Sequence, residues 1–139
     1  MPKGFRGTCV RYDIDVPSTS NAAITCFPRT GADAVAYFLF SNNNAMLDYY
    51  KDQLVLNPSP QISFTGEHNQ DCEHEVYDEG KWGDGRLVCY ATPGNSVPVV
   101  EWTSNNCSVY AFAYRQIEDK NGLTLYNWWS DGKKSGPIC

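Results

Sequence analysis

Residues 34–40 of the chain run AVAYFLF, with no charged residue, proline or glycine among them. An unbroken apolar and aromatic run of this length is typical of a strand that is buried on both faces of a sheet. Gly31 lies shortly before the run, and the polar residues SNNN follow it at positions 41–44. These flanks predict a turn on one side and candidate helix N-caps on the other. We therefore expect residues 34–40 to form a central strand.

Shorter strands are expected on both sides of this run. Before it, residues 9–15 alternate apolar and polar side chains with the period of a half-buried strand, and residues 22–27 form another strand that ends at Pro28. After it, apolar segments bounded by turn residues predict three more strands, over residues 86–91, 97–103 and 109–114.

Two segments carry apolar side chains near the helical period instead. Residues 45–56 do so just before a proline-containing segment, which ends a helix. Residues 123–130 present Leu125, Trp128 and Trp129 on a second, shorter helix. Between the two halves, residues 57–86 combine prolines, glycines and acidic residues, and we predict that they are irregular.

The order of these elements predicts an α+β fold in one domain over residues 1–139. Short connections force neighbouring strands to run antiparallel. A helix with a single apolar stripe buries it against a sheet, and we expect both helices to pack on one face. Each half has three strands followed by a helix, which indicates an internal ββ(β)α repeat. The prediction is thus an antiparallel sheet with two helices on one face, stapled by disulfides.

The composition excludes several classes of protein. A chain of 139 residues fits a single domain. Its 42% hydrophobic and 14% aromatic residues are too many for a disordered chain. No apolar run approaches the roughly 18 residues of a membrane helix. A formal net charge of -5 argues against a general nucleic-acid binder.

Six cysteines are spread along the chain: Cys9, Cys26, Cys72, Cys89, Cys107 and Cys139. Their number is even, and no pair has the C-x-x-C spacing of a zinc ribbon or a thioredoxin-like site. A disulfide framework in an oxidising compartment suits this pattern better. Sequence alone does not choose among the many pairings that six cysteines allow. Since near neighbours close loops most easily, we expect three bridges, Cys9 with Cys26, Cys72 with Cys89, and Cys107 with Cys139.

An exported domain needs a targeting signal, yet the first residues of the chain show no apolar leader. Two interpretations follow. The protein is cytosolic, or it is part of an exported protein whose signal or membrane anchor lies outside this chain. The cysteine pattern favours the second interpretation. We therefore expect an extracytoplasmic domain, secreted or on the outer face of the membrane, and linked to the membrane only through such an anchor.

Acidic residues are concentrated in one segment, which has no lysine or arginine. The acids are Glu67, Asp71, Glu73, Glu75, Asp78 and Glu79, and the only two histidines, His68 and His74, lie among them. One interpretation is a cation site or a docking patch for a basic partner, and the commoner one is a solvated loop. The spacing of an EF-hand is absent, and a zinc site around Cys72 lacks a clear fourth ligand. No metal and no cofactor are therefore predicted.

The sequence has no recognisable catalytic motif. A nucleophile elbow of the G-x-S-x-G type, a P-loop and a G-x-G-x-x-G loop are all absent. Nothing in the spacing of the sixteen acids singles out a carboxylate pair. We therefore expect a non-catalytic module that binds a ligand or a partner. The alternatives are a structural or assembly subunit with an aromatic contact surface, and a small secreted hydrolase with a carboxylate site.

Several short motifs occur in an order that resembles one group of proteins. They are GF at residues 4–5, ITC at 24–26, GADAVAYFLF at 31–40, LDYY at 47–50, GRLVCY at 85–90, VEWT at 100–103 and LYNWW at 125–129. Together they resemble the extracytoplasmic C-terminal domains of actinobacterial membrane Ser/Thr protein kinases and related secreted or lipoprotein-like domains.

This resemblance implies a sensor or binding domain outside the membrane, with the kinase on the cytosolic side. It implies no catalytic residue in the domain and no particular ligand. It also implies that four cysteines, Cys9, Cys26, Cys72 and Cys89, lie where the family forms its pairs. Cys107 and Cys139 are then an addition to the family pattern.

The candidate ligand site lies where residues 66–86 meet the sheet, because loops on a rigid scaffold often carry function. Its residues are His68, Glu73, His74, Glu75, Asp78, Glu79 and Trp82. Carboxylates, imidazoles and one aromatic ring suit a cation, a cell-wall-type sugar or a basic protein surface. Trp102 and Trp128 are expected in the core. The positions of Trp129 and Trp82 are left open, since adjacent tryptophans on a helix are not expected to face the same way.

Overall fold

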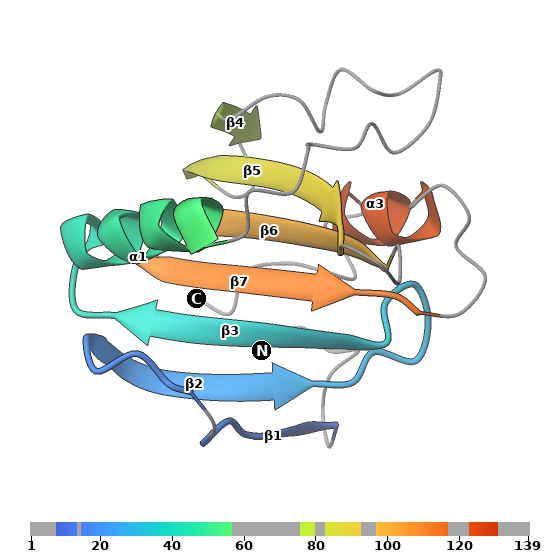
Figure 1. Cartoon of the computed structure of the whole chain (residues 1–139), viewed down its shortest axis with the longest axis horizontal. Helices are drawn as coiled ribbons and strands as arrows, with labels where there is room; N and C mark the ends of the chain where they lie inside the picture. The colour runs from blue at the N-terminus through green and yellow to red at the C-terminus, as the bar shows by residue number, and fades with distance from the viewer. Residues whose placement is uncertain are drawn as a thin grey trace.

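The computed structural model describes residues 8–13, 15–56, 76–79, 83–92, 97–116 and 123–130. These residues form one antiparallel sheet of seven strands and two helices (Figure 1). The strands are β1 (Cys9–Arg11), β2 (Ser20–Cys26), β3 (Ala34–Phe40), β4 (Val76–Glu79), β5 (Gly83–Ala91), β6 (Pro98–Ser104) and β7 (Val109–Tyr114). The helices are α1 (Asn43–Leu56) and α3 (Leu123–Ser130).

The sheet consists of two antiparallel meanders that meet inside it. The strand order is β1-β2-β3-β7-β6-β5-β4, so the meander β1-β2-β3 joins the meander β4-β5-β6-β7 where β3 pairs with β7. The predicted α+β class and the antiparallel sheet are confirmed. The predicted interior position of residues 34–40 is also confirmed, because β3 lies between β2 and β7.

One strand lies in the segment for which the sequence predicts irregular structure. β4 pairs with β5 from Val76 opposite Arg86 to Glu79 opposite Gly83. The paired segments, residues 76–79 and 83–86, lack the alternation of apolar and polar side chains that is typical of a half-buried strand, so the sequence pattern does not predict this pair. The backbone hydrogen bonds to β5 define β4 instead, and they do not depend on side-chain type. At the other edge, β1 ends at Arg11 and is shorter than the predicted strand.

The polar residues after β3 start helix α1. Asn42 Oδ1 accepts a hydrogen bond from the backbone N–H of Ala45 at 2.9 Å, which makes Asn42 the N-cap. The helix therefore begins at Asn43, two residues before the predicted start. The Ser108 hydroxyl donates to Asn43 Oδ1 at 2.8 Å, so the first turn of α1 is tied to the β6–β7 turn.

The two helices lie on opposite faces of the sheet, and the prediction that both pack on one face is wrong. Successive side chains of a strand point to opposite faces. Tyr37 on β3 belongs to the buried cluster that contains α3, whereas its neighbour Phe38 belongs to the cluster that contains α1. In Figure 1, α1 lies in front of the sheet. The physical reason is that β3 is apolar on both faces, and each face needs its own cover.

This arrangement does not match two copies of one repeated unit. A repeat across the antiparallel β3–β7 pair would be related by a two-fold axis normal to the sheet, because that axis reverses the strand direction. The same axis keeps each face unchanged, so both helices would lie on one face. The helices lie on opposite faces instead. The similar order of elements in the two halves is therefore not a structural repeat of the whole unit.

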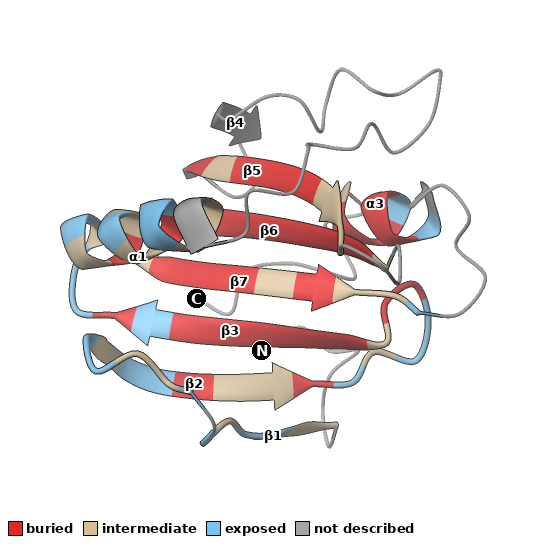
Figure 2. Cartoon of the chain, viewed as in Figure 1, coloured by how far each residue is buried: buried red, intermediate tan, exposed pale blue. Residues whose placement is uncertain are grey.

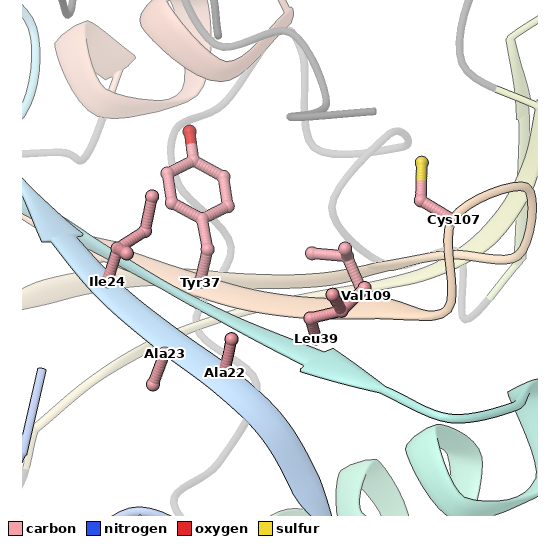
Figure 3. Close-up of a pocket in the computed structure, with 7 residues that line it drawn as sticks. All are labelled: Ala22, Ala23, Ile24, Tyr37, Leu39, Cys107 and Val109. Carbon is pink, nitrogen blue, oxygen red and sulfur yellow. The ribbon is translucent and has the colours of Figure 1, made fainter. Parts of the chain in front are cut away.

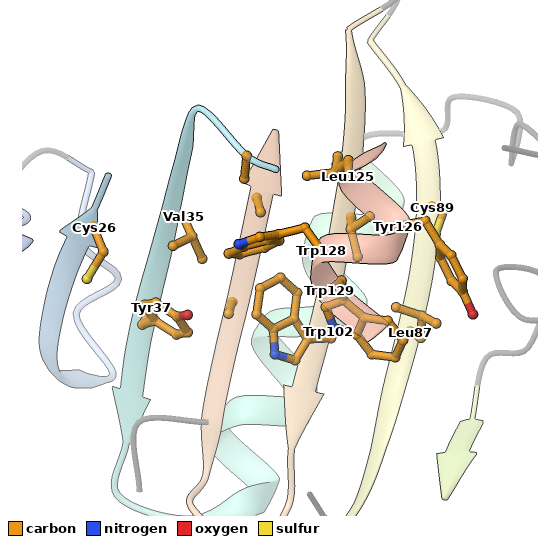
Figure 4. Close-up of a cluster of buried hydrophobic side chains, with 14 of the residues drawn as sticks. Cys26, Val35, Tyr37, Leu87, Cys89, Trp102, Leu125, Tyr126, Trp128 and Trp129 are labelled. Carbon is orange, nitrogen blue, oxygen red and sulfur yellow. The ribbon is translucent and has the colours of Figure 1, made fainter. Parts of the chain in front are cut away.

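The cluster under α3 is built around three tryptophans (Figure 4). Trp102 of β6 is 1% exposed, and its ring centroid lies 6.4 Å from those of both Trp128 and Trp129. Trp128 and Trp129 are both buried in this cluster, so the expectation that adjacent tryptophans cannot both face one way is wrong. Leu125 and Tyr126 of α3 are buried as well, so the helix presents a wide apolar arc rather than a narrow stripe.

The cluster under α1 is rich in phenylalanine and tyrosine. Met46 and Tyr50 of α1 are buried against it. Phe38 lies near its centre, with ring centroids 5.5 Å from Tyr12 and 5.8 Å from Tyr110. Buried residues concentrate on β3 and β5 to β7, as Figure 2 shows. The core thus has two layers, one on each side of the same sheet.

The predicted bridge between Cys9 and Cys26 is present, and it joins the registered neighbours of β1 and β2. Cys89 and Cys107 are also disulfide-bonded. Cys72 and Cys139 lie outside the described residues. The pairings Cys72 with Cys89 and Cys107 with Cys139 therefore stay predictions.

Peptide mapping under non-reducing conditions is expected to recover three disulfide-linked peptides, with Cys9 joined to Cys26. The remaining two are expected to join Cys72 to Cys89 and Cys107 to Cys139, because near neighbours close loops most easily. Recovery of two or more free thiols from the native protein would contradict the oxidised framework.

Replacing Gly31 with alanine is expected to destabilise the fold. Gly31 has φ +89°, and an added Cβ would come within 2.4 Å of Trp128 Cβ. Backbone strain and overpacking together should lower the free energy of unfolding by about 2–4 kcal/mol, as measured by urea denaturation. The matched control is Thr30→Ala at the exposed neighbouring position, which should change stability by less than about 0.5 kcal/mol. Equal stability of the two variants would contradict the tight contact between Gly31 and α3.

Candidate functional site

Most residues of the predicted loop site lie outside the described part of the chain. These are His68, Glu73, His74, Glu75 and Trp82. The structure places Asp78 and Glu79 in β4, where they pair with Asp84 and Gly83 of β5. β4 is the edge strand, beyond β5 in the strand order. The acidic segment thus reaches the sheet at the edge opposite β1, and its role as a ligand site stays a prediction.

A groove lies elsewhere, on the α3 side of β2, β3 and β7 (Figure 3). Its volume is about 430 Å³. The described residues that line it are Ala22, Ala23, Ile24, Tyr37, Leu39, Cys107 and Val109. Three strands of one rigid sheet supply most of these residues, and the β6–β7 turn supplies Cys107. Small β2 side chains next to larger β3 and β7 side chains leave the hollow.

The register of the strands explains why these side chains share one face, except for Ala23, which belongs to the cluster under α1. Ala22 is opposite Leu39, and Ile24 is opposite Tyr37, across the β2–β3 pair. Leu39 is in turn opposite Val109 across the β3–β7 pair. Directly opposed residues on antiparallel strands point to the same face of the sheet. The described lining of the groove is therefore mainly a continuous row of facing pairs.

Tyr37 provides the polar group of the groove. The residue is 3% exposed, and its hydroxyl is buried without a hydrogen-bond partner among the described residues. Its ring packs edge-to-face against Trp102, with the centroids 6.0 Å apart. Burial raises the pKa of Tyr37 well above that of an exposed tyrosine. The hydroxyl therefore stays protonated at neutral pH and is able to donate a hydrogen bond.

Leu39 marks the open side of the groove. It is 41% exposed, whereas every other residue of β3 is buried. A single exposed leucine is common at a protein surface, so its value here is to show where the hollow is accessible. Cys107, at the far end, lies with its Sγ 3.4 Å from the Ser104 hydroxyl, and its disulfide holds this end in place. The groove thus has a buried hydroxyl inside and an apolar opening.

A second buried polar group lies on the opposite, α1 side of the sheet. Glu101 of β6 is 3% exposed, and the Tyr90 hydroxyl donates to its Oε1 at 2.6 Å. Within the described part of the chain, Oε2 has no hydrogen-bond partner. Burial raises the pKa of Glu101, and the hydroxyls of Tyr90 and Tyr110 lower it in part. The partner of this carboxyl group is a phenol, whereas glycoside hydrolysis requires a second carboxylate.

Sequence patterns did not indicate the groove. Ala22, Ile24, Leu39 and Val109 look like ordinary strand residues, and only their pairing across three strands makes a hollow. One signal was present, because Tyr37 is the only side chain with a polar atom in the run 34–40. A hydroxyl in a strand that is buried on both faces needs a partner, which is a reason to suspect a site.

Among the described residues, no group of three or more His, Cys, Asp or Glu side chains is placed to hold a metal ion. Neither described helix is long and apolar enough to span a bilayer.

Replacing Glu101 with glutamine is expected to change how stability depends on pH. Because its pKa is raised in the folded state, the carboxyl group favours folding below the ordinary glutamate pKa of about 4.3. That contribution is lost as the pH rises through the raised value. The wild type should therefore lose stability relative to Glu101→Gln over a pH range that rises from the ordinary glutamate pKa of about 4.3. Urea denaturation of both proteins across this range measures the difference, and a difference that is constant with pH would contradict the buried carboxyl group.

Comparison with known proteins adds no relative from which a site could be transferred. No protein-family model, curated protein or solved structure matches this chain. The resemblance to extracytoplasmic kinase domains therefore depends on the short motifs alone, and the assignment of a site depends on the geometry of the described residues.

Proposed function

We propose that this protein is a non-catalytic, extracytoplasmic binding module of the sensor type, and that the groove on the α3 side of β2, β3 and β7 is its ligand site. The observation that carries the proposal is a buried hydroxyl without a partner among the described residues, that of Tyr37, at an otherwise apolar hollow. Ligand sites are typically mostly apolar, with a few polar groups that fix the orientation of the ligand. A volume of about 430 Å³ lies within the usual range for small molecules.

The rigidity of the groove also supports binding. Its walls belong to interior parts of the sheet, where β3 pairs with β2 on one side and β7 on the other. The Cys9–Cys26 bridge holds the outer strands in register. Sites that are built on strands change little when they bind, so less free energy is spent on ordering the site.

The chemistry of the groove favours binding over catalysis. Among its described residues, Tyr37 carries the only group that titrates, since the Cys107 sulfur is in a disulfide. With its raised pKa, Tyr37 is a poor base at neutral pH. A nucleophile needs an adjacent base to be activated, and the described lining offers no such pair.

The disulfides support a location outside the cytoplasm, because such bonds persist in oxidising compartments. The family resemblance adds the hypothesis that a membrane anchor and a kinase belong to the full protein, which would make the groove a sensing site. The acidic segment with His68, Glu73, His74, Glu75, Asp78, Glu79 and Trp82 is a separate candidate for a cation, a cell-wall-type sugar or a basic protein. It adjoins β4, three strands beyond β7 in the sheet.

A second candidate function, assembly, has one observation in its favour. Three large apolar residues, Val10, Phe27 and Leu39, are 56%, 48% and 41% exposed on or next to β1, β2 and β3. Val10 is opposite Thr25 and Leu39 is opposite Ala22, so Val10 and Leu39 point to opposite faces of the sheet, and the assembly hypothesis depends on the surface around Val10. Sedimentation analysis over a range of concentrations tests this alternative. A dimer that Val10→Ser dissociates would favour assembly, and a monomer at all concentrations would exclude it.

A thermal-shift screen tests the groove as a ligand site. The panel contains uncharged apolar compounds, sugars, peptides and cations, and the proteins are the wild type, Ala22→Phe and Asn21→Phe. Ala22 is exposed and lines the groove, so a phenylalanine there fills the hollow without entering the core. Asn21 is its exposed neighbour and lies outside the groove lining. A ligand at about 100 times its Kd stabilises the native state by about 2.7 kcal/mol, which raises the Tm by several degrees.

We expect at least one class of compound to raise the Tm of the wild type and of Asn21→Phe, and not that of Ala22→Phe. Stabilisation that survives in Ala22→Phe would place the ligand site elsewhere, for example in the acidic segment. Turnover of any compound in a parallel hydrolase panel would contradict the non-catalytic assignment.

A further inference from the structure

We infer that the groove takes an uncharged, largely apolar small molecule with a single hydrogen-bond acceptor, such as a ketone or ester carbonyl, and that the Tyr37 hydroxyl donates to this acceptor. The inference rests on the proposed function, because it names the ligand class of the same groove. A ligand of this class binds in the groove without any contribution from the acidic segment.

The walls of the groove select an apolar molecule. The side chains of Ala22, Ile24, Leu39 and Val109 are hydrocarbon and offer no hydrogen bond. A sugar has several hydroxyl groups, and each one buried here without a partner would lose its bonds to water. Hydrocarbon carbons gain free energy on the same surface in proportion to the area that they bury. The described groove is therefore matched to a hydrocarbon body rather than to a sugar.

The position of Tyr37 fixes where the acceptor must be. Its ring stands away from β3 beside Ile24, with the hydroxyl outermost from the strand (Figure 3). Tyr37 is 3% exposed and Leu39 is 41% exposed, so Leu39 lies on the accessible side of the groove and Tyr37 on its buried side. A molecule that enters past Leu39 brings its leading end to the hydroxyl. The acceptor is therefore expected on that leading end.

Charge complementarity excludes an ionic leading end. No lysine, arginine or histidine is among the described residues of the groove. A carboxylate loses favourable interactions with water when it is buried here. A neutral phenol offsets little of that loss, and no cation among the described residues of the groove offsets the rest. An ammonium group could donate a hydrogen bond only to the oxygen of the Tyr37 hydroxyl among the described side chains of the groove. A neutral carbonyl, in contrast, accepts the hydrogen bond that the Tyr37 hydroxyl lacks among the described residues, and it buries no net charge.

Fluorescence titration with prodan tests the inference directly. Prodan is an uncharged naphthalene dye with one ketone, and its emission moves to longer wavelength when that ketone accepts a hydrogen bond. We expect saturable binding to the wild type. We also expect methyl heptyl ketone to displace the dye at lower concentration than nonanoate at neutral pH, because the chain lengths match and only the charge differs.

The variant Tyr37→Phe removes the donor and keeps the ring. Its affinity for prodan should fall by about two- to tenfold, which is the usual net contribution of one hydrogen bond. The emission of the bound dye should shift to shorter wavelength, a change that a merely structural role of the hydroxyl would not produce. The matched control is Tyr12→Phe, which removes a hydroxyl on the α1 side of the sheet and should leave both readouts unchanged.

The outcomes separate the ligand class from the site. If nonanoate competes as well as the ketone, or if Tyr37→Phe binds prodan with unchanged affinity and emission, the ligand class is wrong. The groove then remains a site only if Ala22→Phe still abolishes binding. If prodan binds Ala22→Phe as tightly as the wild type, it binds outside the groove and the inference is overturned. The comparison of ketone with nonanoate uses the wild type alone, so it decides the ligand class even if a variant fails to fold.

Discussion

The antiparallel pairing of β3 with β7 joins two meanders that are separate in the sequence, and the rest of the structure depends on it. The register runs from Ala34 opposite Tyr114 to Leu39 opposite Val109. Because this pair lies inside the sheet, its side chains point to two faces that both need cover. Helix α1 covers one face with Met46 and Tyr50, and helix α3 covers the other with its tryptophans. The opposite placement of the helices follows from this one pairing.

The candidate site results from how α3 covers its face. The helix packs on β6 through Trp102, while the row of pairs from Ala22 to Val109 lies further along the same face, towards β2. Gly31 allows α3 to approach closely, since any side chain there would collide with Trp128. The close packing of the helix and the hollow beside it are therefore parts of one arrangement. The first stabilises the fold, and the second offers an apolar surface on a rigid base.

Two of the buried polar side chains, Glu101 and Tyr37, differ in their surroundings. Glu101 has a partner in Tyr90, and its neighbourhood is the aromatic cluster under α1. Its contribution is to stability and to the dependence of stability on pH. The Tyr37 hydroxyl has no partner among the described residues and lies beside a hollow. Leaving such a group unsatisfied costs free energy, which a ligand that accepts its hydrogen bond would recover.

The sequence by itself determined the elements and the class of fold. The apolar run 34–40 predicted β3, the segments around residues 109–114 and 123–130 predicted β7 and α3, and the even set of cysteines predicted the bridge between Cys9 and Cys26. These features are local, or they follow from residue type, so a linear pattern contains them. The strand β4 was missed because only its pairing with β5 defines it.

Only the tertiary structure decided the faces of the two helices and the position of the groove. An apolar stripe on a helix states that it packs against something, but not on which side of a sheet. The groove likewise depends on register, since Ala22, Tyr37 and Val109 share a face only because three strands align as they do. Register is set by contacts between residues that are distant in the chain. For this reason the sequence contained every residue of the candidate site and no pattern that brought them together.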